Sequence, residues 1–167
     1  MAEKTTSRSE RLADQFEETL ENFVGVVDAM TADQWRMRGK NTPGQRINDE
    51  DEARPLGVIA HHVAVNLKVI MGRIQMVLHD EPTPPADFTQ INKRHANEFA
   101  DTTKAEVLRL LRDSGSQIAK DLRAIPDEKL DMARELPSGK MTVHDRIERV
   151  LIGHIKGHQG SIEATIA

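Results

Sequence analysis

The chain contains no cysteine, and aromatic residues make up only 3% of its 167 residues. Without cysteine the protein has no disulfide, no thiolate zinc cluster, no iron-sulfur ligation and no thiol nucleophile of its own. Thiol chemistry would therefore need a thiol supplied by another molecule. Because aromatic side chains are scarce, a core must be built from aliphatic side chains and methionine, which suits interdigitating helices.

The chain also lacks a basic excess and a long apolar run. Lys and Arg number 23 against 27 Asp and Glu, which disfavours binding to nucleic-acid phosphates. The first ten residues have no apolar signal-peptide segment, and the most apolar stretch, 58–78, is interrupted by polar residues. We therefore expect a soluble cytoplasmic protein without membrane association. One domain over residues 1–167 is expected, because this length supports a single core.

Four amphipathic segments predict an all-α four-helix bundle. The first has apolar residues at steps of three and four from Leu12 to Met30, where Thr31 and Gln34 have the spacing of a capping box. The second runs from Pro55 to the prolines at 82–85, and the third from Thr103 to Pro126. The fourth extends from about Val143 toward Ile166 after a capping pattern of Thr142 and Asp145, and Thr103 and Glu106 have the same spacing at the start of the third. The stretches between them, including 38–54 and 127–141, are predicted as irregular, and no strand is expected.

Histidines interrupt the inward apolar stripe of the fourth segment. His154 and His158 are four residues apart, so their rings lie on one helix face and both can reach a single ion. Each buried imidazole needs a partner in an aliphatic core, and a shared cation satisfies both. A hydrogen-bonded core pair without metal is the alternative interpretation.

The second segment contains adjacent histidines, which point about 100 degrees apart on a helix. The summed direction of the apolar side chains around the helix axis places His62 at the border of the core and His61 outside it. We therefore predict a metal site of His62, His154 and His158, with a coordination position left for water or substrate. The remaining histidines are predicted to lie on the surface or at helix ends: His61, His79, His95 and His144.

The sequence lacks the residue spacings that two other kinds of metal site require. A di-iron carboxylate bundle uses Glu-x-x-His pairs, and no glutamate here has a histidine three residues later. A zincin needs a glutamate directly after the first histidine, where this chain has Ile155. Asn66, Asp145 and Glu148 are near the pattern, but no spacing selects an acid or base. No catalytic residue is assigned.

Three stretches resemble the DinB-like superfamily of metal-binding four-helix bundles, in order and separation: PLGVIAHHVAVN, INKRHANEFADTTKAEVLRLLRDSG and VLIGHIKGHQGSI. The resemblance implies an up-down-down-up bundle in which His62, His154 and His158 bind a divalent metal. The chain departs from the family pattern after the histidine pair, where Gly160, Ser161 and Ile162 stand in place of the usual Gly-Gln-Ile.

The resemblance further implies homodimers and reactions that use low-molecular-weight thiols such as mycothiol or bacillithiol. The leading hypothesis is an enzyme in which a divalent ion activates a small thiol for S-transfer, or for a related hydrolysis or isomerisation of a small-molecule substrate. Zinc or nickel is favoured, with manganese or iron as the alternatives. The alternative hypothesis is a non-enzymatic, stress-related helical bundle that binds a metal or another ligand.

Overall fold

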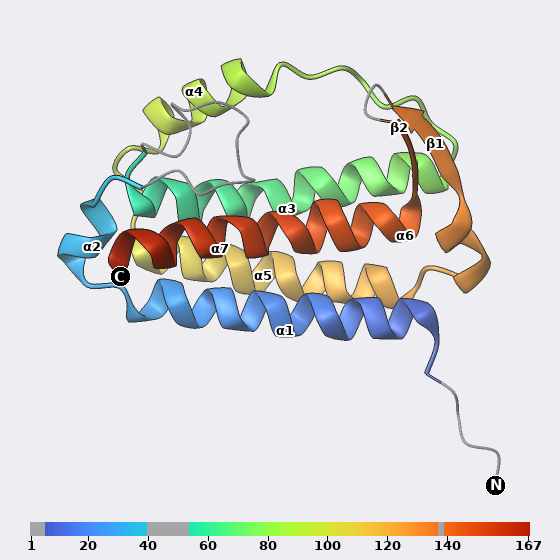
Figure 1. Cartoon of the computed structure of the whole chain (residues 1–167), viewed down its shortest axis with the longest axis horizontal. Coiled ribbons are helices and arrows are strands. Elements are labelled where there is room, and N and C mark those ends of the chain that lie inside the picture. The colour runs from blue at the N-terminus through green and yellow to red at the C-terminus, as the bar shows by residue number, and fades with distance from the viewer. Residues whose placement is uncertain (1–5, 40–53, 137–138) are drawn as a thin grey trace, which may run out of the picture.

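The computed structural model describes residues 6–39, 54–136 and 139–167, and this part of the chain is mostly helical, as predicted. Long helices lie side by side along most of its length (Figure 1). They are α1 (Arg8–Ala29), α3 (Leu56–Leu78), α5 (Lys104–Arg123) and a last helix that runs without a break through α6 (Val143–Asp145), η3 (Arg146–Ile152) and α7 (Gly153–Ile166). Helices α1 and α3 each pack against both α5 and α7. This arrangement lets α3 and α7 face each other.

The helix ends follow the capping signals in the sequence. Helix α1 ends at Met30, and Thr31 then begins the short helix α2 (Ala32–Arg36) with the predicted capping box. Thr142 forms another predicted box with Asp145 at the start of α6. The Thr103 hydroxyl accepts the Glu106 N–H at 3.3 Å and caps α5. These local hydrogen bonds satisfy backbone donors that have no partner inside a helix.

The core between the long helices is aliphatic except for two phenylalanines of α1. Phe16 and Phe23 are fully buried, and Leu and Ile side chains from the other helices surround them. The largest fully buried aliphatic residues are Leu56, Ile59, Leu67, Ile74, Leu111, Leu122, Leu130, Ile147, Leu151 and Ile152. Close packing of these chains fixes the spacing of the helices that carry the histidines.

The last helix is unusual because its η3 segment is π-helical over seven residues. The N–H of Gly153 donates to the carbonyl of Glu148, five residues earlier. A π-helical stretch is rare and is found frequently at functional sites. Here it ends at Ile152, two residues before His154, so it determines the rotation at which α7 begins.

The start of α3 is held by a close approach to Trp35 of α2. A β-carbon at Gly57 would lie 2.3 Å from the Trp35 ring, so only glycine fits this position without rearrangement. The Trp35 indole N–H donates to the carbonyl of Thr102 at 3.0 Å. This contact joins α2, the first turn of α3 and the residues before α5, and it anchors the part of α3 that carries His61 and His62.

Two stretches predicted to be irregular contain regular structure. Helix α4 (Phe88–Glu98) follows α3 and precedes α5 in the chain. A two-stranded antiparallel sheet forms from β1 (Ala133–Leu136) and β2 (Gly139–Thr142). A short 3-10 helix, η2 (Asp127–Asp131), precedes the sheet. Helix α4 buries only two polar residues and so has no apolar stripe, while strands of four residues are too short to reveal alternation. The prediction of no strand was wrong for this reason.

Most of the predicted loop 38–54 lies outside the described residues. Its two ends meet, because the Gly39 N–H donates to the Arg54 carbonyl at 2.9 Å. Within the described ranges, no helix combines the length and apolar character needed to cross a lipid bilayer.

Candidate metal centre

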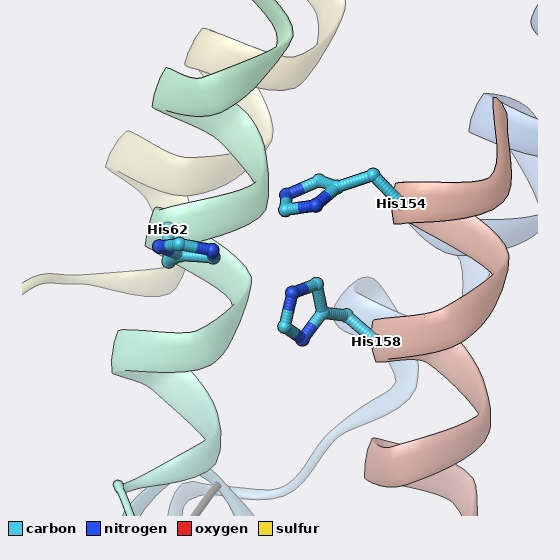
Figure 2. A group of neighbouring side chains, drawn as sticks. All are labelled: His62, His154 and His158. Carbon is cyan, nitrogen blue, oxygen red and sulfur yellow. The ribbon is translucent and has the colours of Figure 1, made fainter. Parts of the chain in front are cut away.

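The structure brings the three predicted histidines together from two helices. His62 lies on α3, while His154 and His158 lie one turn apart on α7, and their rings point toward one another (Figure 2). One ring nitrogen from each histidine lies within 4.8 Å of the other two. The ring centroids of His62 are 5.2 Å from His154 and 5.0 Å from His158. The geometry therefore places three donor atoms around one point.

The chemistry of this donor set fits a divalent cation. Nitrogens around a tetrahedral zinc at 2.0–2.1 Å are about 3.4 Å apart, so small ring rotations would bring these imidazoles into range. Burial, followed by His154 and His158, lowers the pKa of His62 well below its ordinary value of 6.5. The ring is therefore neutral at physiological pH, which is the state that binds metals.

The donor set is limited to three protein ligands within the ranges that the structure describes. No further histidine, aspartate or glutamate of those ranges joins His62, His154 and His158. Structural zinc sites are closed by four protein ligands, whereas catalytic sites commonly have three and leave a position for water or substrate. The described residues therefore have the composition of an open site.

Asn66 holds the ring of His62 from one turn further along α3. Its amide nitrogen lies 3.0 Å from Nδ1 and 3.1 Å from Nε2 of His62. An ion takes one of these ring nitrogens, and the other then carries a hydrogen and donates it to the Asn66 amide oxygen, which a 180-degree flip of the side-chain amide brings into place of the nitrogen. Partners of this kind fix the orientation of a ligating histidine. The sequence placed Asn66 near the pattern without assigning it this role.

Substituting Asn66 with alanine is expected to lower zinc affinity by about 10–100-fold, because the His62 ring loses the group that orients it. Isothermal titration calorimetry of the metal-free protein with zinc measures this change. Lys68→Ala is the matched control, since Lys68 is an exposed residue of the same helix. Equal zinc affinity for Asn66→Ala and wild type would show that Asn66 does not orient a ligand.

His61 and His95 are buried, which corrects the prediction that both lie on the surface. His61 is only 1% exposed, its ring is stacked on Phe99 at 4.1 Å, and its Nδ1 lies 2.8 Å from Nε2 of His95. The reason is that α4 and Phe99 cover the face of α3 that carries His61. The other two histidines agree with the prediction, because His79 is exposed and His144 lies half-exposed at the start of α6.

A signal for this burial was present in the sequence. No charged residue occurs from Leu56 to Leu67, and residues 56–64 are all buried whichever way they point. A helix that is apolar on every side is covered on every side. The direction of the apolar residues alone therefore underestimated how much of α3 is enclosed.

Arg54 is a charged residue near the histidines that sequence reasoning missed. It is buried, and its positive charge lowers the pKa of both His62 and His95. It belongs to a stretch that was predicted as a surface loop. It lies two residues before Leu56, at the end of a run of charged residues, so composition pointed to solvent and no spacing pattern marked it as buried.

Acid is expected to destabilise the metal-free protein through His95. Burial, followed by His61 and Arg54, lowers the pKa of His95 from 6.5 to about 4. The unfolded chain therefore takes up this proton first as the pH falls, and stability declines between pH 6.5 and 4, by up to about 3 kcal/mol. Urea unfolding across this range measures the slope. His95→Gln should make the slope shallower without abolishing it, because burial also lowers the pKa of His61 and His62. An unchanged slope would contradict the assignment.

Comparison with known proteins agrees with this architecture. The family model described as the DinB superfamily matches residues 15–162. No curated protein matches the chain. A solved structure titled "Sibling Lethal Factor Precursor - DfsB" is similar over 97% of this chain and 95% of that chain, with a TM-score of 0.62 and 18% identity. At this identity the likeness concerns the fold alone.

Proposed function

The chain belongs to the DinB superfamily, and from that premise we propose that it is a metal-dependent enzyme that uses a small thiol as cosubstrate. His62, His154 and His158 would hold a divalent ion, with zinc or nickel favoured by the imidazole donors. The observation that carries the proposal is the convergence of three donor nitrogens within 4.8 Å, without a fourth protein ligand among the described residues.

A bound divalent cation would lower the pKa of a coordinated thiol or water and stabilise the resulting anion. The protein's own residues support this chemistry in three ways. The buried His62 is neutral and available as a ligand, and Asn66 orients its ring. Arg54 adds positive charge near His62, which favours an anion at this position. The chain has no cysteine, so the thiol has to come from a cosubstrate.

S-transfer to a small electrophile, or a related hydrolysis or isomerisation, is the reaction class that we propose. The up-down-down-up order of the helices is part of the same proposal. It is supported by Figure 1, where the colour runs along α1 and α7 toward the end that carries α2, and along α3 and α5 away from it. A homodimer and a cytoplasmic location complete the proposal.

Metal analysis and thiol titration test this function together. Protein purified without an affinity tag is expected to retain about one divalent ion per chain, as a three-imidazole site should. Cobalt-substituted protein should then develop a sulfur-to-metal charge-transfer band when a small thiol is added. A protein that binds no metal, or whose cobalt spectrum does not respond to any thiol, would contradict the enzyme proposal.

The same thiol titration distinguishes the enzyme from the alternative, a non-enzymatic metal-binding protein. In a non-enzymatic metal-binding bundle, the ion would be retained and would stabilise the fold, but added thiols would leave the cobalt spectrum unchanged. His154→Ala should abolish the cobalt spectrum in either case, which locates the ion at the histidines.

A further inference from the structure

Arg146, the first residue of η3, is buried, and no acidic side chain of the described residues forms an ion pair with it. It is 7% exposed, and its Nε and Nη2 atoms are buried with no hydrogen-bond partner within the described ranges. The nearest acidic residues along its own helix are engaged elsewhere, because Asp145 pairs with Arg149 at 3.7 Å and Glu148 lies 3.9 Å from His144. Burying a guanidinium in this state is unfavourable unless a ligand compensates for it.

The charges that surround Arg146 make its position more unfavourable. Burial, followed by Arg134 and Arg73, lowers the pKa of Arg146. Arg134 of β1 donates to Asp80 at 2.9 Å, and Arg73 of α3 donates to the Pro84 carbonyl at 3.1 Å. Three arginines from separate elements therefore create a local positive potential. Such a potential attracts anions.

The unpartnered atoms of Arg146 have the geometry of an anion clamp. Nε and Nη2 form one edge of the guanidinium, and their parallel N–H groups match two oxygens of a carboxylate or a phosphate. The other two arginines are held by their own contacts, including the Phe88 ring, whose centroid lies 5.4 Å from the Arg73 guanidinium carbon. Arg146 is therefore the member of the cluster whose donor edge awaits an oxyanion.

The cluster lies along the same pair of helices as the histidines. Arg146 precedes His154 by eight residues, or about two turns of the last helix, and Arg73 follows His62 by eleven residues, or about 16 Å along α3. Both displacements lead to the end of the molecule where β1 and β2 lie (Figure 1). The arginines therefore lie on the same two helices as the histidines, nearer to that end.

We propose that Arg146, assisted by Arg73 and Arg134, binds a carboxylate or phosphate group of a small-molecule ligand. The anion site itself does not depend on a metal. Its role in positioning a substrate whose reactive end reaches the histidines rests on the proposed function. If the site serves the proposed function, the substrate class narrows to small molecules with a carboxylate or phosphate group remote from the reacting atoms.

Calorimetric titration of the metal-free protein with inorganic phosphate, and separately with succinate, tests the anion site. Saturable binding of at least one of the two is expected, and the comparison tells whether phosphate or carboxylate is preferred. Arg146→Met should weaken that binding by at least about tenfold, because a charge-assisted bidentate contact is lost. Arg149→Met is the matched control and should bind as wild type, since Arg149 is exposed on the same helix.

Further variants separate this inference from the metal proposal and from a structural role. His154→Ala should bind the anion normally, so a failed metal site would leave the result intact. Arg146→Met should be at least as stable as wild type in anion-free buffer, because an uncompensated buried charge is removed. If Arg146→Met does not fold, Arg146→Lys retains the charge but lacks the two parallel N–H groups, and it should still weaken binding. Absence of binding to wild type, or equal binding to wild type and the Arg146 variants, would overturn the proposal.

Discussion

Replacing His154 with alanine is expected to remove most of the stabilisation that zinc confers on the protein. A ligand present at a thousand times its dissociation constant stabilises the folded state by about 4 kcal/mol. Removing one of three imidazoles leaves His62 and His158, which bind the ion far more weakly, so most of this gain disappears. Thermal unfolding with and without zinc measures the difference between the two proteins.

His79→Ala is the control for this experiment, because His79 is an exposed histidine at the end of α3. It should retain the full zinc response. Metal-free His154→Ala should unfold close to the metal-free wild type, since His154 is only half-buried. A zinc response that survives in His154→Ala would place the ion at other residues and would contradict the three-histidine site.

Phe16→Ala is expected to cost about 3–5 kcal/mol of the free energy of unfolding, the usual range for a buried phenylalanine. Phe16 is 0% exposed and belongs to a core that contains few aromatic side chains. The aliphatic neighbours are held by four helices and can fill the resulting cavity only partly. Because single domains are stable by only about 5–15 kcal/mol, this loss is large. Urea unfolding measures this loss of stability, provided that the free energy of unfolding has the same dependence on urea concentration in both proteins.

Phe88→Ala provides the comparison for Phe16→Ala, because Phe88 is 46% exposed on α4. Its substitution should change stability by less than about 0.5 kcal/mol, as surface substitutions usually do. If both phenylalanines gave equally small effects, the packing of α1 against the other long helices would not be the main source of stability.

The long helices were predictable because their signals are local. Apolar residues recur at steps of three and four, and the caps at Thr31, Thr103 and Thr142 lie within one turn of the backbone groups they bind. Helix α4 instead depends on α3, which it covers, and its own sequence has no apolar stripe. The strands do pair locally, because Ala133 and Thr142 are nine residues apart, but the ladder is too short to show a pattern.

The histidine site was predicted for the same reason that the helices were. His154 and His158 share a face through local spacing, and the apolar direction of α3 placed His62 at the core border. The burial of His61 and His95 depends on α4 and Phe99, which fold back over α3, and the burial of Arg54 is not marked by any local pattern. Arg146 was also missed, because a charged residue beside an apolar stripe is normally solvated.

Because η3 is π-helical, the spacing of the histidine pair and its orientation around the helix axis are set by different segments. The spacing of His154 and His158 belongs to α7 alone, whereas the angular phase of the whole pair is set upstream, by the wider winding of residues 146–152. The same seven residues in ordinary α-helical winding, at about 100 degrees each, would turn further around the axis before α7 begins. Both rings would then rotate together around the helix axis, with their separation preserved and their aim at His62 lost.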